Sequence, residues 1–141
     1  MSRPTFPDVQ LYDWPTNFVC DDIQDYLIAN GILNVGDSQC FEWQSGKDKQ
    51  ILIRDSGGFA SAVPESSRNN TFQVLLRGAK DEGHKDLAEQ AYAICKFLVN
   101  SDSFTVNNNR YSQVFMVSDP SIIGRDEENR ALVSINFSAA R

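Results

Sequence analysis

The segment TFQVLLRG, residues 71–78, is the clearest strand in the sequence and decides the fold class. Phe72, Val74 and Leu76 take alternate positions in it, which is the period of a strand with one face against a core. The segment ALVSINFS, residues 131–138, shows the same alternation. The segment QILIR, residues 50–54, has consecutive apolar residues, so we expect a strand buried on both faces.

Weaker patterns predict the remaining strands and their connections. Shorter strands are expected at residues 39–44, 103–106 and 110–117. Turns are expected where Gly, Asn or Asp cluster, at residues 45–48, 55–58 and 107–109. Two polar segments are expected to be exposed loops: residues 62–70, with Pro64, and residues 118–130, with four acidic residues.

Two amphipathic helices are predicted from apolar residues at helical spacing. The first is expected to begin at a cap on Thr16 or Asn17 and to end at Asn30-Gly31. Its polar residues are expected to face away from the core: Asp21, Asp22, Gln24 and Asp25. The second is expected to begin at Asp81 and to run to about Asn100. Its core-facing stripe is predicted to comprise Leu87, Ala88, Ala91, Tyr92, Cys95, Leu98 and Val99.

Residues 1–15 contain three prolines and are expected to form an extended arm rather than a helix. The arm carries Phe6, Leu11, Tyr12 and Trp14, and we expect them to pack either on their own domain or on a neighbouring subunit. The chain alternates helix, strands, helix, strands. This order predicts an α+β fold with a mainly antiparallel sheet flanked by two helices, in one domain over residues 1–141.

Composition excludes several classes of function. Thirteen Lys and Arg against nineteen Asp and Glu give a net charge of −6, which opposes general nucleic-acid binding. A negative surface would still let DNA pass without sticking. No apolar run approaches the ~20 residues of a membrane span, and the N-terminus lacks a signal segment. We therefore expect a protein made and kept in a cytoplasm, with no membrane partner.

Cysteine and histidine usage gives little support for catalysis. Cys20, Cys40 and Cys95 form no Cys-x-x-Cys pair, which argues against a disulfide framework, and Cys20 and Cys95 are expected to be small core residues. The single histidine, His84, stands beside acidic residues that a solvated helix start explains equally well. No residue is marked as a nucleophile for it.

The acidic segment Asp119 to Glu128 could bind a hard cation through its oxygens, but it lacks the calcium-loop pattern. Residues 55–58 could present backbone donors to an anion, yet no phosphate-loop motif follows. We therefore expect an interaction protein with no catalytic residues, no cofactor and no metal. A small metal-dependent hydrolase built on Asp119 to Glu128 remains an alternative.

One ordered set of segments resembles a known family. It comprises ILIRD with Gly57-Gly58 (residues 51–58), a loop with Pro64, FQVLLRG (72–78) leading into an Ala-rich helix, PSIIGRD (120–126), Arg130, and INF (135–137). Together these segments, over about six-tenths of the chain, resemble the tail terminators and related minor capsid or tail-completion proteins of long-tailed bacteriophages.

The resemblance implies a virion structural protein at the head-proximal end of the tail, present in the host cytoplasm during assembly. It implies a ring, usually a homo-hexamer, that caps the tail tube, ends tube polymerisation and offers a docking face for the head-neck. Its partners would be further copies of itself, the tail tube protein and a neck or head-completion protein, with DNA only passing through the lumen. A neck or head-completion (head–tail connector) role is the alternative within the same virion.

A closed ring needs two different complementary surfaces on each subunit. The apolar arm could supply one, through Phe6, Tyr12 and Trp14, and an exposed strand edge the other. Charged residues at strand ends and loop starts are further interface candidates, because ion pairs across a boundary fix register: Arg54, Asp55, Arg77, Arg125 and Asp126. Arg54 and Arg77 could instead pair within their own subunit or face water.

Overall fold

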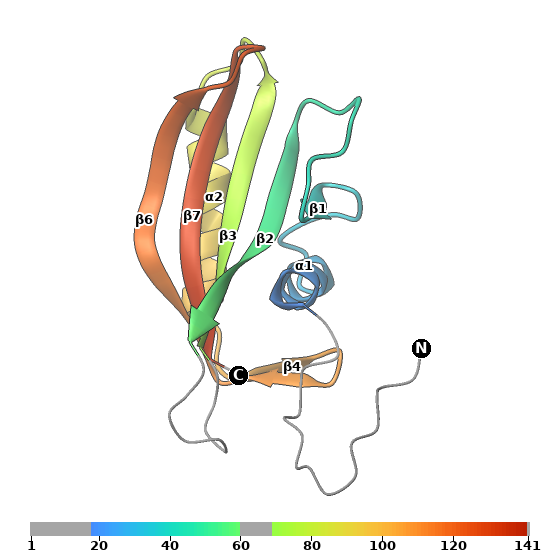
Figure 1. Ribbon diagram of the computed structural model, residues 1–141, viewed down its shortest axis with the longest axis vertical. Helices are drawn as coiled ribbons and strands as arrows, with labels where there is room; N and C mark the ends of the chain where they lie inside the picture. The colour runs from blue at the N-terminus through green and yellow to red at the C-terminus, as the bar shows by residue number, and fades with distance from the viewer. Residues whose placement is uncertain (1–17, 60–68, 141) are drawn as a thin grey trace, which may run out of the picture.

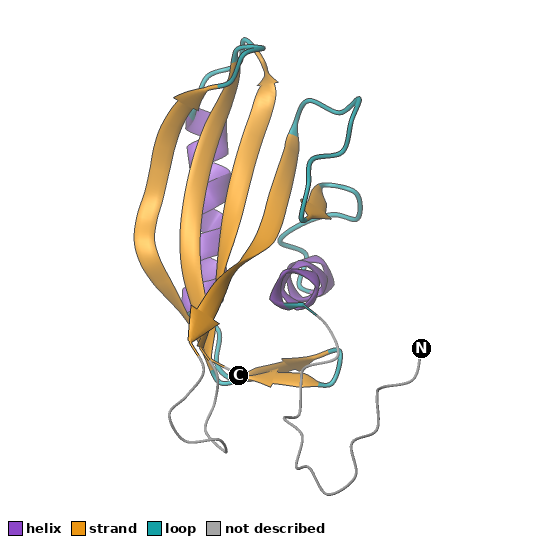
Figure 2. Ribbon diagram, in the orientation of Figure 1, coloured by secondary structure: helices purple, strands orange, loops and turns teal. Residues whose placement is uncertain are grey.

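The computed structural model describes residues 18–59 and 69–140. Within these described residues, two helices and seven strands follow one another, and Figures 1 and 2 show their arrangement. They are α1 (Val19–Ala29), β1 (Ser38–Cys40), β2 (Gln50–Phe59), β3 (Asn69–Lys80), α2 (Lys85–Val99), β4 (Phe104–Val106), β5 (Asn109–Tyr111), β6 (Gln113–Arg125) and β7 (Arg130–Ala140). Neither described helix is long and apolar enough to cross a membrane.

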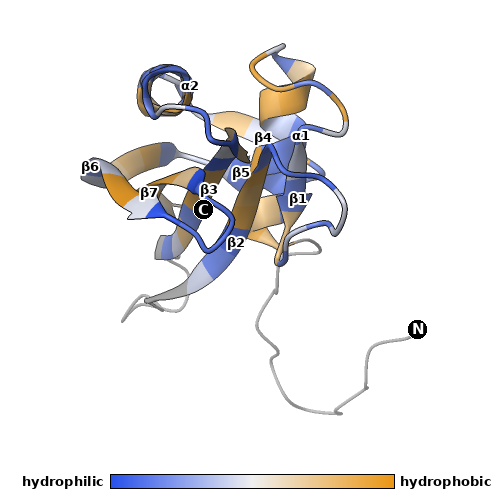
Figure 3. Ribbon diagram, turned by 90° about the horizontal axis from the view of Figure 1, so that it is seen from above, coloured by the Kyte–Doolittle hydropathy of each residue, from blue (hydrophilic) through white to orange (hydrophobic). Residues whose placement is uncertain are grey.

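Five strands form one sheet in the order β1-β2-β3-β7-β6, and β4 pairs with β5 as a separate hairpin. β1 runs parallel to β2, and every other neighbouring pair is antiparallel. Seen from above, α1 and α2 lie on the same face of the sheet (Figure 3). The predicted α+β fold with a mainly antiparallel sheet and two helices is confirmed.

The core lies between the two helices and the alternating apolar residues of the central strands. Phe72 on β3 is opposite Phe137 on β7, and their rings stack with centroids 5.1 Å apart. On β2, Leu52 faces away from the core cluster and is still only 2% exposed. The expectation that this strand is buried on both faces is therefore confirmed.

The β-strands are longer than the turn residues suggest. Residues 55–58 do not end β2, because a bulge between Asp55 and Gly57 lets Gly57 and Gly58 continue the pairing with β3. Asn69 and Asn70, assigned to the loop at residues 62–70, belong to β3, whereas residues 60–68 lie outside the described residues. β1 is shorter than expected and ends at Cys40.

The largest correction concerns the predicted loop at residues 118–130. β6 runs from Gln113 to Arg125, so only residues 126–129 form a turn. Pro120 lies within the strand, where its missing N–H costs little because β6 is an edge strand and the register is irregular between Ser118 and Ser121. The predicted strand at 110–117 is in fact the end of β5 and the start of β6.

Both helices begin later than their expected caps. α1 has Phe18 at the N-cap with no side-chain cap, and Thr16 and Asn17 lie outside the described residues. α2 begins after His84, because Asp81 adopts a positive φ of 64° in the turn that leaves β3. The end of α1 is as predicted, with Gly31 at φ 74°.

The buried stripe of α2 is narrower than the sequence suggests. It comprises Leu87, Ala91, Ile94, Cys95 and Leu98. Tyr92 and Val99, which were expected to face the core, are 59% and 40% exposed. Ile94 was not expected in the stripe and is fully buried.

Asp22 does not face solvent, contrary to the sequence expectation, and it joins α1 to the β4–β5 hairpin. Its carboxylate accepts hydrogen bonds from Asn107 Nδ2 at 3.1 Å, from Asn109 Nδ2 at 2.9 Å and from the hydroxyl of Tyr111. Asn107 and its neighbour Asn108 have positive φ, as expected for a turn of asparagines. The hairpin thus covers a buried carboxylate that the helical pattern alone assigned to the surface.

We predict that Asp22→Ala lowers the free energy of unfolding by about 3 kcal/mol, because three buried or part-buried donors lose a charged acceptor. Urea denaturation followed by circular dichroism measures this. Glu89→Ala, at an exposed position of α2, serves as the control and should change the free energy by less than about 0.5 kcal/mol. Equal stability of the two variants would contradict the assigned role.

Candidate assembly surface

β6 pairs only with β7, so its second edge has no strand beside it among the described residues. Five large apolar side chains on this strand are exposed, and we call them the β6 edge: Phe115, Met116, Val117, Ile122 and Ile123. Their exposed fractions run from 38% for Met116 to 62% for Ile122. An apolar group of this kind beside unpaired backbone donors and acceptors is typical of a site for another protein chain.

The β6 edge presents apolar groups on both faces of the sheet. Met116 lies opposite Phe137 and Ile122 opposite Val133, which places both on the face that the helices cover. Phe115 lies opposite Ser138 and points to the other face. A partner strand added here would therefore find apolar contacts above and below its backbone.

The neighbouring side of α2 extends this apolar surface. Tyr92 and Val99 are exposed and lie about one helical turn on either side of Cys95. Burial, together with the negative charge of Asp119 on β6, raises the pKa of Cys95 to about 11. The apolar surface thus includes parts of two elements.

A cluster of charged residues occupies the end of the sheet where β6 turns into β7. Arg130 Nε contacts Asp126 Oδ2 at 2.7 Å, and its Nη1 contacts Asp48 Oδ1 at 3.0 Å and Glu128 Oε2 at 3.2 Å. Burial alone would raise the pKa of Asp126, but hydrogen bonds from the main chain and side chain of Arg130 lower it below its usual range. These contacts join the β6–β7 turn (residues 126–129) to the connection between β1 and β2, which we call the 41–49 segment.

Arg77 fastens the 41–49 segment from the other side. Its Nε donates to the carbonyl of Asp48 and its Nη2 to the carbonyl of Lys47, both at 2.8 Å, and its guanidinium lies 4.4 Å from the ring centre of Trp43. The buried Gln50 also donates to the carbonyl of Lys47, at 2.6 Å. Burial, with the nearby charge of Arg130, lowers the pKa of Arg77.

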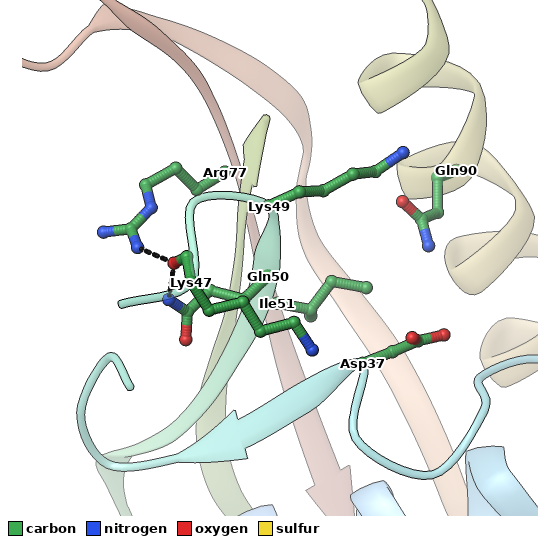
Figure 4. A pocket seen from close by; sticks show the side chains of 7 residues that line it. All are labelled: Asp37, Lys47, Lys49, Gln50, Ile51, Arg77 and Gln90. Atoms are coloured by element: carbon green, nitrogen blue, oxygen red, sulfur yellow. Dashed lines mark hydrogen bonds between the residues drawn. The ribbon is translucent and has the colours of Figure 1, made fainter. Parts of the chain in front are cut away.

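Lys47, Gln50 and Arg77 border a cavity of about 390 Å³, and its lining also includes Lys49 and Gln90 (Figure 4). Two of its three cations already bind main-chain carbonyls, because Lys47 Nζ donates to Gly36 and Arg77 to Lys47 and Asp48. Their donors are largely used within the chain. The cavity is therefore better explained by loop anchoring than by a ligand.

The sequence profile of a family described as bacteriophage tail terminator protein matches residues 26–141. The chain belongs to the bacteriophage tail terminator family. It is therefore a structural protein of a phage tail, a component of the virion, that interacts with other tail or head components. Among curated proteins, no sequence matches it.

The charged residues predicted for the interface of this tail terminator lie at two places. Arg77, Arg125 and Asp126 come together at one end of the sheet, while Arg54 and Asp55 lie further along β2. Each has a partner within the chain. Arg54 binds Gln73 Oε1 at 2.6 and 2.9 Å, and Arg125 Nη1 donates to the carbonyl of Asn129 at 3.0 Å.

Asp55 supplies the cap that α1 lacks. Its Oδ1 accepts a hydrogen bond from the N–H of Cys20 at 2.8 Å, at the start of the helix. The remaining interface candidates of the arm, Phe6, Tyr12 and Trp14, lie outside the described residues.

The acidic segment proposed for a hydrolase does not gather into a metal site within the described chain. Asp119 lies in β6, whereas Asp126 is bound by Arg130 in the turn. His84 Nε2 lies 3.0 Å from the carbonyl of Gly124 and tethers α2 to β6. The single group of three metal-ligating side chains among the described residues lies elsewhere, at Cys20, Asp21 and Cys40.

Sequence reasoning missed the β6 edge, although a pattern for it was present. Residues 114–117 and 122–123 are consecutive apolar residues in a segment otherwise polar. Successive side chains of a strand alternate between faces, so half of such a run must be exposed unless both faces are covered. No sequence pattern of this kind could have shown that Asp22 is buried, because its hydrogen-bond partners Asn107 and Asn109 are more than eighty residues away.

We predict that Asp55→Ala lowers the free energy of unfolding by about 1 kcal/mol through loss of the cap on α1. Thermal and urea unfolding of the isolated protein measure this. Asp55→Asn keeps a capping oxygen and should recover most of the loss. If both variants are as stable as the wild type, the contact does not cap the helix.

We also predict a pH-dependent contribution from Asp126. Its pKa is lowered in the folded protein, so ionised Asp126 stabilises the fold above the ordinary carboxyl pKa of about 4, and this stabilisation is lost as the pH falls through the lower folded value. The difference in unfolding free energy between wild type and Asp126→Asn should therefore shrink as the pH is lowered through that range. A difference that does not change with pH would contradict the pairing with Arg130.

Proposed function

We propose that the protein closes the head-proximal end of the phage tail tube as a ring, most simply a homo-hexamer, which ends polymerisation of the tube protein and offers a docking face for the neck. The observation that carries the ring is the β6 edge, because the outer edge of this long strand pairs with no other strand among the described residues and exposed apolar side chains lie on both of its faces. Family membership supports the place in the tail.

The ring contact that we propose is heterologous. The β6 edge of one subunit binds a different surface of the next, and rotation by the same step closes the ring. The arm supplies that second surface through Phe6, Tyr12 and Trp14, since its prolines favour an extended chain that can lie along a strand edge.

The charged residues of the β6–β7 turn have a separate role in this proposal. Arg125 and the carboxylates of Glu127 and Glu128 are exposed at the tip of the β6–β7 turn. Of these, Glu127 is the group that we propose for contact with the tube protein or the neck protein, because Glu128 is paired with Arg130 and Arg125 donates to the carbonyl of Asn129 within the turn. The net charge of −6 suits a lumen through which DNA must pass without binding.

The direct test is to add purified protein to tail tube protein during polymerisation and to image the products by electron microscopy. Tubes of limited length that carry an extra ring at one end are the expected result. Tubes that grow as long and end as bluntly as without the protein would refute the capping role. Location of the protein on separated heads instead of tails would favour the neck role.

We predict that Ile122→Lys abolishes the ring and the capping of tubes, because a lysine cannot be buried at an apolar strand contact without its charge being paired. Native mass spectrometry and the capping assay measure this. Val35→Lys is the matched control, since Val35 is 86% exposed and shortly precedes β1, which forms the opposite edge of the sheet from β6. It should assemble normally.

Both side chains are exposed, so both monomers should stay within about 0.5 kcal/mol of wild-type stability. Val117→Lys is a second variant of the same strand and should behave like Ile122→Lys. Normal rings from both β6 variants would mean that subunits join elsewhere.

A further inference from the structure

Two cysteines and an acidic residue come together at the start of α1, away from the β6 edge. The sulfurs of Cys20 and Cys40 and a carboxylate oxygen of Asp21 all lie within 4.8 Å of one another. Cys20 and Asp21 belong to the first turn of α1, and Cys40 is the last residue of β1. Cys20 is fully buried, while Asp21 and Cys40 are half-buried. Neither the proposed ring nor the capping of the tube uses these groups.

The side chain of Gln24 could supply a fourth metal ligand, because its amide oxygen points toward Cys40. Gln24 Nε2 donates to the carbonyl and to the hydroxyl of Ser38, at 2.9 and 2.8 Å. Only the NH₂ group of the amide can donate to a carbonyl, so these bonds fix which way the side chain points. The amide oxygen is thereby turned to Cys40, with Oε1 and Sγ 3.5 Å apart. Such supporting hydrogen bonds are typical of groups that orient a metal ligand.

We propose that Cys20, Asp21 and Cys40 bind a zinc ion, with the amide oxygen of Gln24 or a water as fourth ligand. Thiolate sulfur and carboxylate oxygen are zinc ligands, and four of them suffice for its tetrahedral geometry. Magnesium and calcium instead require six or more oxygens, which this group does not offer. Thiolates select zinc among the common divalent ions.

The geometry requires only a small contraction. Ligand atoms around tetrahedral zinc lie about 3.3–3.8 Å apart, as follows from zinc–ligand distances of about 2.0–2.3 Å. The three side chains are within 4.8 Å, and two of them are half-buried and can change rotamer. The same partial exposure gives the ion a path from solvent. No salt bridge joins Asp21 to a cationic side chain in the described chain, so its charge is available to a metal.

Bound zinc would join α1 to β1 where the pair is otherwise held by few polar contacts. β1 is a three-residue edge strand, and the side chain of Gln24 supplies its hydrogen bonds to the helix. The ion would cross-link the first turn of the helix to this strand. It would therefore stabilise the folded chain in proportion to the logarithm of the zinc concentration above its dissociation constant. This inference does not rest on the proposed function.

The test uses the full chain, purified under reducing conditions and freed of metal with a chelator. Zinc chloride is titrated in by calorimetry, metal per chain is measured by mass spectrometry, and thermal unfolding is followed with and without zinc. Cobalt(II) then replaces zinc, because a thiolate-to-cobalt absorption band reports sulfur ligation directly. We expect one zinc per chain, a higher unfolding temperature with zinc, and the cobalt–thiolate band.

The variants separate this site from other zinc binding. Cys20→Ser and Cys40→Ser should each weaken zinc binding by at least about tenfold and reduce the cobalt–thiolate band. Cys40→Ser is decisive if the buried Cys20→Ser variant fails to fold. Cys95→Ser is the matched control, because Cys95 is a buried cysteine of α2 outside the group, and it should bind zinc as the wild type does.

Two outcomes would overturn the proposal. One is wild-type protein with no zinc and no change in unfolding temperature under reducing conditions, including the case in which Cys20 and Cys40 merely form a disulfide on oxidation. The other is equal zinc binding by wild type, Cys20→Ser and Cys40→Ser, which would place the ion at another part of the surface.

Discussion

The pairing of β3 with β7 is the constraint on which the remainder of the structure depends. Three opposed pairs lie on one face of these strands and are almost completely buried: Phe72 with Phe137, Val74 with Ile135, and Leu76 with Val133. Burial of each such side chain contributes about 1.5–3 kcal/mol. Both helices pack on the surface that these pairs form, and β2 and β6 add to its two sides. A one-residue slip of this register would turn the whole apolar set away from the helices.

The same arrangement creates the β6 edge. The sheet ends at β6 on one side, and the core needs only some of its apolar residues, such as Val114, to be buried. The others have no cover within the described chain. Bulges and Pro120 interrupt the strand, and such interruptions hinder indiscriminate pairing with other sheets. An edge that is both apolar and irregular fits the assembly that we propose, because it limits pairing before the correct partner is met.

Most of the conspicuous polar residues are used to hold the fold together. Asp22 anchors the β4–β5 hairpin, Asp55 caps α1, and Arg77 fastens the 41–49 segment. Charged residues with partners this close contribute less to binding another chain, because a new contact must replace an existing one. Among the residues that the structure describes, no partner competes for the apolar β6 edge, so it is the better candidate for assembly than the ion pairs.

The sequence by itself determined the fold class, the three strands with apolar alternation or apolar runs, the end of α1 at Gly31, and the family resemblance. These follow from local periodicity, local turn chemistry and the order of segments, all of which are contained in the chain. Only the tertiary structure decided where β6 ends, because Pro120 is read as a breaker unless the strand is known to be an edge. Likewise Asp22 is polar on a helix, and its burial depends on Tyr111, which is 89 residues away. The β6 edge and the Cys20–Cys40 group were also decided by the tertiary structure. The order of strands leaves β6 at the edge of the sheet, where its apolar side chains are exposed. The placement of α1 beside β1 brings Cys20 close to Cys40, although twenty residues separate them in the sequence.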